Sequence, residues 1–333
     1  MAGKNPIDLS RIPAPDVVEA LDYETLLHNT TQQLLSLAPE LADTLALESE
    51  PINKLVQLCA YRELLLRQRV NEAARAVMLA FATGTTLEHL GALMGVARLT
   101  IIAANPNANP PTPAVLEHDD DYRARIQLAL DGLSTAGPEL AYIYHALSAS
   151  GLVLDASVTT PTFSKATISQ SLQAQLPANA IVLQVEEGAG LPNPMPGDVV
   201  ITVLSRENNG LPSAATLQAV TDALNAESVR PVTDHVHTQA AQLIDFGITA
   251  SIFTFPGPDT AVVLQEANEQ LATYLEENQR LGRSITLSGI YAALHVPGVQ
   301  RVDVAAPATD ILCTSAQAAR CIEKNINHGG TAS

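Results

Sequence analysis

One long helix dominates the pattern of apolar and polar positions in this sequence. From Pro51 onward, apolar side chains recur in alternating steps of four and three over about thirty residues, interrupted once, at Glu63. The eight positions of this row, called the seam below, are Ile52, Val56, Cys59, Leu66, Val70, Ala73, Val77 and Ala80. Such spacing is typical of a helix that packs lengthwise on another helix. At about 1.5 Å per residue the helix would be roughly 45 Å long, more than a small domain can cover.

The same helix carries apolar side chains outside the seam. Leu55, Leu58 and Leu65 lie beside it, and charged residues, mostly arginines, occupy the remaining face. An earlier helix over residues 27–37, broken by Pro39, is expected to pack antiparallel on the seam. We interpret this region as a helical hairpin or bundle with spare apolar surface, so the seam is the candidate subunit interface. The alternative is an ordinary helical domain that covers its own apolar rows.

Three further helices and a loop are predicted before the strands begin. The long helix should end near Gly84, and a short helix follows with Thr85 or Thr86 as its N-cap. Residues 105–113 form a loop rich in proline and asparagine. The last two helices of this region start at Asp119, where acidic residues suit the first turn, and at Glu139.

Near residue 152 the apolar pattern changes from a helical period to alternation. The predicted strands are 153–158, 180–185, 198–205, 232–237, 247–255, 299–305 and 320–326. The predicted helices among them are 213–228, 259–281 and 285–294. Each half is expected to be a small antiparallel sheet with helices on one face.

These elements predict a multidomain α+β fold, with an N-terminal long-helix bundle followed by two small α+β domains. The expected bundle is residues 1–100, and a proline-rich loop and helical connector covers 101–151. The two α+β domains are expected at 152–245 and 246–333.

Composition narrows the range of partners. Hydrophobic residues make up 47% of the 333 residues and charged residues 16%, so the chain can build large cores. The net charge is −17, of which residues 99–333 contribute −13 from 23 acidic and 10 basic side chains. An acidic chain without tryptophan is a poor partner for a phosphate backbone or for stacked bases, so no nucleic acid is expected.

Cysteine usage and hydropathy point to folding in a reducing cytoplasm. Cys59, Cys313 and Cys321 do not have the spacing of a disulfide framework. Residues 1–15 lack the apolar core of a secretory signal. The longest apolar run, residues 76–82, is too short to cross a bilayer, so no membrane insertion is expected.

A search for chemistry finds no catalytic or cofactor motif, neither a nucleophile elbow, a phosphate loop nor a zinc-protease helix. The consecutive carboxylates of residues 119–121 point in different directions on a helix, and His235 and His237 lack further ligands, so no metal site is predicted. Residues 328–330 are interpreted as a flexible tail. We therefore predict no catalytic residue, no cofactor and no enzyme activity.

Six short strings stand in order along the chain. The first is A-T-G-x-x-L-x-x-L-G-x-x-x-G-V-x-R over residues 82–98, and the second is D-x-x-R-x-R-I over residues 120–126. The others are S-T-A-G-P at 134–138 with Tyr142, G-D-V-V-I at 197–201, R-P-V-T-D at 230–234, and V-P-G-V at 296–299 with Val302. Together they resemble the baseplate protein J family of contractile-tailed phages and R-type pyocins.

The resemblance implies a structural protein of the tail baseplate wedge, which is assembled in the bacterial cytoplasm and is part of the tail baseplate of the released particle. Family members bind a second wedge protein, of the baseplate protein I type, through their N-terminal helices. The small sheath-initiating wedge protein, another copy of the chain and the central hub or spike are the other partners implied. The C-terminal domains of neighbouring wedges would form a ring around the hub that rearranges when the sheath contracts.

The competing interpretation is an α+β enzyme or ligand-binding protein with a helical dimerisation arm. It predicts a deep polar pocket that contains titratable groups with shifted pKa values.

Overall fold

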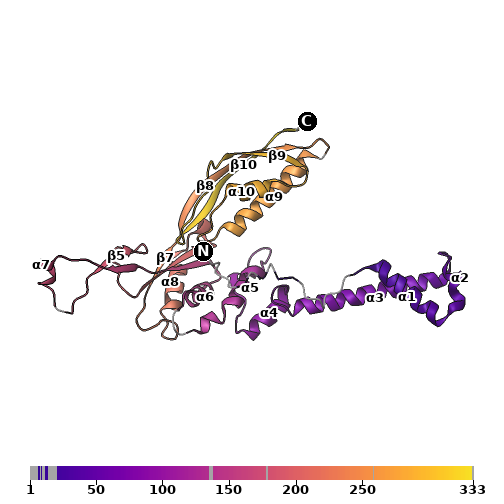
Figure 1. Ribbon diagram of the computed structural model, residues 1–333, viewed down its shortest axis with the longest axis horizontal. Coiled ribbons are helices and arrows are strands. Elements are labelled where there is room, and N and C mark those ends of the chain that lie inside the picture. Colours follow the sequence, from indigo (N-terminus) through magenta and orange to yellow (C-terminus); the bar gives the residue numbers. More distant parts are fainter. Residues whose placement is uncertain are drawn as a thin grey trace. The chain divides into compact units, whose positions relative to one another are not determined.

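The computed structural model describes residues 7, 9, 12–13, 21–134, 138–177, 179–257 and 259–331. The chain divides into two compact units, whose elements are labelled in Figure 1. The helical unit comprises residues 1–98 and 118–127, and the sheet unit comprises residues 99–117 and 128–333. A helical unit and a second unit of small sheets with helices confirm the predicted multidomain α+β class. The four domain boundaries expected from the sequence stay a prediction.

The helical unit contains α1 Tyr23–Leu37, η2 Pro39–Leu41, α2 Ala42–Leu45, α3 Pro51–Ala76, α4 Gly84–Leu93 and most of α5 Asp119–Leu128. The Asp22 carboxylate caps α1 by accepting a hydrogen bond from the backbone N–H of Glu24, and Pro39 follows its end. Pro51 occupies the first turn of α3, where a missing N–H costs no helical hydrogen bond. α1 packs against α3, so the predicted pairing of these helices is confirmed. The prediction that this packing covers the seam is wrong, because the buried residues of α3 are Val56, Ala60 and Asn71.

The long helix ends earlier than its apolar pattern predicts. α3 stops at Ala76 after 26 residues, and turns carry the chain to Gly84, where α4 begins. The Arg123 guanidinium donates hydrogen bonds to the carbonyl oxygens of Leu79 (2.8 Å) and Ala82 (2.7 Å) in this stretch. A side chain distant in sequence thus binds carbonyls that a longer helix would use internally. The last two seam positions, Val77 and Ala80, therefore lie in turns past the end of the helix.

The first sheet of the sheet unit has the strand order β3-β6-β7. Its strands are β3 Val153–Thr159, β6 Asp198–Ser205 and β7 His235–Ala240, and its core includes side chains of α6 Glu139–Ala149 and α8 Ala214–Leu224. All eight residues of β6 are buried, as in a central strand covered on both faces. β3 is antiparallel to β6, whereas β7 is parallel to it, after the crossover through α8. The prediction of a purely antiparallel sheet is therefore wrong.

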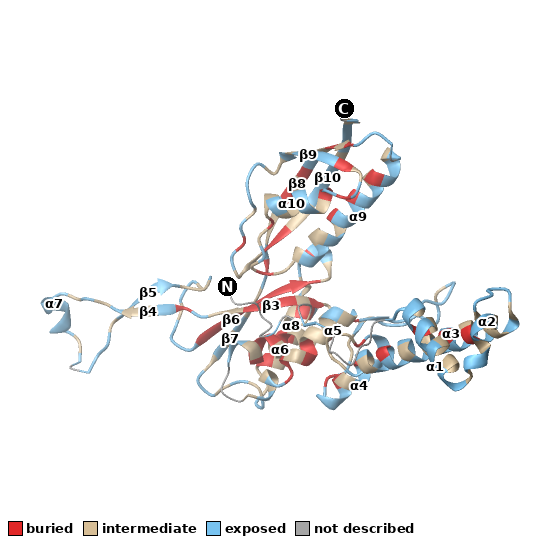
Figure 2. Cartoon of the chain, turned by 45° about the vertical axis from the view of Figure 1, so that its right-hand side comes forward, coloured by how far each residue is buried: buried red, intermediate tan, exposed pale blue. Residues whose placement is uncertain are grey.

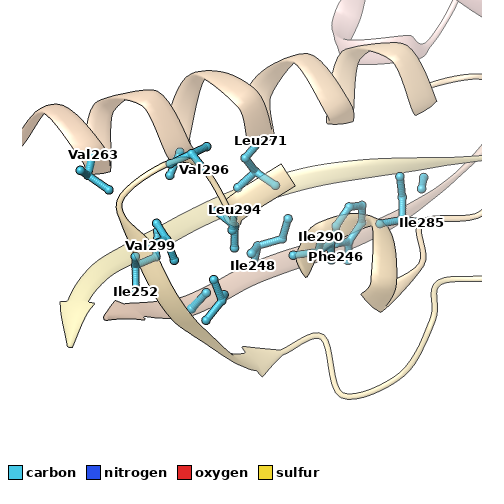
Figure 3. Close-up of a cluster of buried hydrophobic side chains, with 14 of the residues drawn as sticks. Phe246, Ile248, Ile252, Val263, Leu271, Ile285, Ile290, Leu294, Val296 and Val299 are labelled. Atoms are coloured by element: carbon cyan, nitrogen blue, oxygen red, sulfur yellow. The ribbon is translucent and has the colours of Figure 1, made fainter. Parts of the chain in front are cut away.

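The second sheet, of order β10-β8-β9, is also mixed. Its strands are β8 Gln242–Thr254, β9 Val299–Ala306 and β10 Gln317–Thr331, with α9 Thr260–Asn278 and α10 Leu287–Leu294 between β8 and β9. β9 is antiparallel to β8 and β10 is parallel to it, so here too the antiparallel prediction fails. Ile248 and Ile252 of β8 pack with Leu271 of α9 and Ile290 of α10 in its core (Figure 3).

β10 also corrects the interpretation of the C-terminal residues. His328, Gly329 and Gly330 belong to this strand and are not a flexible tail. A β-carbon at Gly329 would lie 2.6 Å from the Phe253 ring, so the glycine lets the two neighbouring strands approach.

Several short elements, among them β1, β2 and β4, were not predicted from the sequence. β1 Thr100–Ile102 and β2 Val115–Leu116 form a hairpin that flanks the predicted loop, and η3 Asp131–Leu133 and η4 Asn208–Gly210 are single turns. β4 Thr162–Lys165 and β5 Leu183–Glu187 form a separate two-stranded sheet, with α7 Gln170–Gln173 between them in sequence. Two strands are displaced from their predicted positions: β5 lies a few residues later, and β7 begins at His235, after a fully exposed Val232.

The two three-stranded sheets are joined within the sheet unit. β7 leads into β8 through a single residue, the buried Ala241. The buried carboxylate of Asp155 on β3 accepts a hydrogen bond from the backbone N–H of Leu281 (2.8 Å). The hydroxyl of Ser157, on the same strand, donates to the carbonyl oxygen of Ser315 (2.6 Å). These two hydrogen bonds and the buried Ala241 between β7 and β8 thus connect the second sheet to the first.

Candidate assembly surfaces

The covered face of α3 is not the seam. Val56, Ala60 and Asn71 are its buried residues, and they follow a row offset from the seam by roughly a quarter of a helical turn. Val56 belongs to both rows. The chain's own contacts therefore cover a neighbouring face of the helix and leave most of the seam open.

The seam itself is largely exposed. Leu66, Val70 and Val77 have exposed fractions of 62%, 60% and 70%, and Cys59 and Ala73 are exposed as well. Ile52 and Ala80 are intermediate. In Figure 2 the burial colours show the same mixture, with few buried residues along α3.

Beside the seam, the exposed apolar surface continues. Leu55, Leu58, Tyr61 and Leu65 are all exposed, as the sequence pattern suggests for an apolar surface wider than one row. Glu63, which interrupts the seam, forms an i,i+4 ion pair with Arg67, at 2.7 Å. The first half of α3 is therefore apolar over more of its circumference than α1 covers.

Two of the sequence strings meet at the base of the helical unit. Gly91 on α4 and Tyr122 on α5 are both buried, and a β-carbon at Gly91 would overlap the Tyr122 hydroxyl. That hydroxyl donates a hydrogen bond to the carbonyl oxygen of Val96 (2.8 Å). The guanidinium groups of Arg98 and Arg125 lie over the Tyr122 ring, at 4.7 and 5.7 Å from its centroid. The first two strings therefore pack α5 against α4.

The aspartates at the start of α5 have structural partners. Asp119 accepts a hydrogen bond from the Gly84 backbone N–H (3.0 Å), which opens α4, and pairs with Arg98 (2.6 Å). Thus the cap predicted at Thr85 or Thr86 is supplied from α5. Burial raises the pKa of Asp119, but the Gly84 N–H and Arg98 outweigh it and hold the pKa below its ordinary value. Asp120 pairs with Arg123 at 2.5 Å.

The sheet unit brings the middle strings together in the same way. The Tyr142 hydroxyl on α6 donates a hydrogen bond to the Asp234 carboxylate (2.7 Å), just before β7. Burial, and then the neighbouring Asp234 carboxylate, raise the pKa of Tyr142, so this phenol stays protonated.

Asp198, which opens β6, holds the neighbouring strand. Its buried carboxylate accepts from the Met195 N–H (2.6 Å) and lies 3.0 Å from Nε2 of His237. The Met195 N–H, helped by His237, keeps the pKa of Asp198 below its ordinary value. His235 lies 3.7 Å from the same carboxylate oxygen. These histidines thus join β7 to β6, and the described residues contain no cluster of three or more side chains suited to a metal ion.

A cleft of about 710 Å³ lies inside the sheet unit, lined by residues of both sheets. Two of its side chains have shifted pKa values. Asp245 raises the pKa of Arg320, which it binds through two 2.7 Å hydrogen bonds, and burial raises the pKa of the Cys321 thiol. Both shifts favour the protonated form, so neither creates a general base or a reactive thiolate.

Among the described residues, no helix combines the length and the apolar character that crossing a bilayer requires.

Comparison with known proteins agrees with the strings and extends beyond them. Family models match at residues 48–105 (Baseplate J-like N-terminal domain), 134–240 (Baseplate J-like central domain) and 246–326 (Baseplate J-like protein C-terminal domain). The chain is also 47% identical over 330 residues to Baseplate protein J of Escherichia phage P2, and the match covers 98% of each protein. Similarity at this level over nearly the whole length shows that the chain belongs to the baseplate protein J family of phage baseplate proteins.

Proposed function

We propose that this chain is a structural component of the baseplate wedge of a contractile tail, in a phage or an R-type pyocin. The seam of α3 binds a second wedge protein, of the baseplate protein I type. The sheet unit binds another copy of the chain, so that neighbouring wedges form a ring around the hub or spike. The small sheath-initiating wedge protein is a further neighbour, and the ring rearranges when the sheath contracts.

The exposed seam of α3 is the observation that carries this proposal. Leu66, Val70 and Val77 are each at least 60% exposed, although they repeat at helical spacing along one line. Covering these side chains and Leu55 would contribute on the order of 5 kcal/mol before the cost of ordering a partner. An apolar row of this kind marks a protein interface rather than a solvent-facing surface.

The geometry favours a helix as the bound partner. Within α3 the seam is spaced in steps of four and three, and polar side chains such as Arg62 and Arg69 lie beside it. A helix with its own apolar row could lie along this surface, as in a coiled-coil pair.

Glutamate substitutions at Val70 and Val77 test the proposal. When the chain is co-expressed with the second wedge protein, V70E/V77E should abolish copurification, because two charges would enter the apolar contact. Both side chains are exposed in the isolated chain, so its circular dichroism and melting temperature should change little. R75E, on the exposed polar face of the same helix, makes the same change of −2 in net charge; it is the matched control and should copurify normally. Normal yield of the V70E/V77E complex would contradict the proposal.

Particles from a strain without this gene give a second test. If the chain is a baseplate component, electron micrographs should show tails without baseplates, or no tails. Intact contractile tails in that strain would refute the proposed role.

A further inference from the structure

The helix that bears the seam is positively charged, although the chain as a whole is acidic. Residues 51–76 of α3 contain five basic and two acidic side chains, a net charge of +3, whereas the whole chain has a net charge of −17. The preceding segment, residues 21–50, contains six acidic side chains and no lysine or arginine. The surface that α3 offers to a partner therefore differs in charge from its surroundings in the sequence.

The side chains of three arginines on this helix form no ion pair or hydrogen bond with another described residue. They are Arg62, Arg69 and Arg75, and all three are exposed. Every other arginine that the structure describes has a hydrogen-bonding, ionic or ring contact. Arg75 lies in the last turn of α3, where the helix dipole favours a positive charge. Within the described chain, Arg62 and Arg69 have no comparable role.

Arg62 and Arg69 flank the seam on its open side. They directly precede Glu63 and Val70, and they are seven residues, or about two helical turns, apart. At about 100° per residue both arginines lie on one side of the seam, and Ala60, which the chain's own contacts bury, lies on the other. A partner that covers the seam would therefore contact both guanidinium groups.

The two arginines restrict what that partner can be. In paired helices, the charges beside the apolar row select the partner and its direction. A guanidinium that loses water without a carboxylate to bind is destabilising, whereas a carboxylate forms charge-assisted, bidentate hydrogen bonds with it. Glu63, which interrupts the seam, is already paired with Arg67 at 2.7 Å. The partner helix is therefore expected to supply the carboxylates.

A second copy of α3 does not meet this requirement. If two copies paired antiparallel along their seams, Arg62 and Arg69 of one copy would face the same two arginines of the other. In a parallel pair, Arg62 of one copy would face Arg67 of the other. Both arrangements bring like charges together, which opposes association. The charges beside the seam thus select against pairing of α3 with itself.

We propose that the seam of α3 binds an acidic helix of a different protein, which carries carboxylates seven residues apart opposite Arg62 and Arg69. The inference rests on the proposed function, because it specifies the chemistry of the partner that the seam binds. Apolar contact along the seam supplies most of the affinity, and the two arginines determine which helix is accepted.

Charge reversal beside the seam of the full-length chain tests this inference. R62E/R69E should raise the Kd for the second wedge protein at least about tenfold, measured by isothermal titration calorimetry, because the carboxylates of the partner would then face glutamates. K54E/R75E also reverses two positive charges at exposed positions of α3, on the side away from the seam, and should bind like the wild type. Raising the salt concentration from about 50 to about 500 mM should weaken the wild-type complex more than the R62E/R69E complex.

The outcomes distinguish this inference from the proposed function. Loss of affinity in R62E/R69E, with the control variant unaffected, supports an acidic partner helix. Equal affinity of R62E/R69E and the wild type would overturn the inference, even if V70E/V77E showed that the seam is the interface. Self-association of the isolated wild type in sedimentation velocity, abolished by V70E/V77E, would identify a second copy on the seam and also overturn it. Normal copurification of V70E/V77E would contradict the proposed function, and with it this inference.

Discussion

Gly91 and Tyr122 form a close contact between two helices of the helical unit. The Tyr122 hydroxyl occupies the space where a β-carbon of residue 91 would lie, and it donates a 2.8 Å hydrogen bond to the carbonyl oxygen of Val96. Packing thus explains the family strings around these residues. The glycine lets α5 approach α4, and the tyrosine side chain fills the space that the missing β-carbon leaves. This contact is the origin of the first prediction.

G91A should destabilise the helical unit by about 1–3 kcal/mol, because the added methyl group overlaps a buried side chain. The free energy of unfolding from urea denaturation measures the effect. A92S, at the exposed neighbouring position, should cost less than about 0.5 kcal/mol. In Y122F the hydroxyl is absent, so G91A should cost less in that background than in the wild type. Equal costs in both backgrounds would show that the close contact is not what excludes alanine.

The hydrogen bond between Tyr142 and Asp234 should stabilise the sheet unit. Y142F leaves the carboxylate without this donor and should lower the free energy of unfolding by about 1–3 kcal/mol. D234A, which removes the acceptor, should cost a similar amount, and the double variant should cost less than the sum of the two. Additive costs in this double-mutant cycle would mean that the two groups do not interact.

Stability should fall in acid partly through Asp198. Its folded-state pKa lies below the ordinary value of 3.8, so its stabilising contribution is fully present above that pH and is lost as the pH falls through the folded-state pKa. D198N should therefore be less stable than the wild type by about 1–2 kcal/mol at pH 7, and the difference should shrink below pH 3.8. Urea denaturation at pH 7 and at a pH below 3.8 measures this difference in the free energy of unfolding. D222N, at an exposed position, is the control, and a D198N deficit that persists unchanged in acid would contradict the assignment.

The elements with a strong local pattern were predictable from the sequence. β6 was predicted with its observed bounds, Asp198–Ser205, because eight consecutive strand residues are bounded by turn residues. α3 was predicted from its apolar repeat and its proline start, although not its end. The predicted end of α3 and the predicted cap of α4 are wrong because residues distant in sequence determine them. Arg123 binds the carbonyl oxygens after α3, and Asp119 caps α4.

Strand direction and the two-stranded sheet β4–β5 could not be predicted from local sequence patterns. Alternation identifies β7 as a strand but cannot show whether its neighbour is parallel, which depends on the crossover through α8. β4 has four residues, too few for a period to be recognised, although β5 beside it was found in part. For the seam, the sequence located the apolar row, but only the structure shows that the covered face passes through Ala60 and Asn71 instead.

Alkylation of Cys59 tests most directly the central claim that the seam of α3 is covered by a neighbouring baseplate protein. Cys59 is an exposed native thiol on the seam, whereas Cys313 is buried within the sheet unit and serves as an internal reference. The rate of alkylation, measured by mass spectrometry, should be fast at Cys59 in the isolated chain and at least about tenfold slower in assembled particles. Cys313 should react slowly in both. Equally fast alkylation of Cys59 in the isolated chain and in the assembled particle would contradict the account.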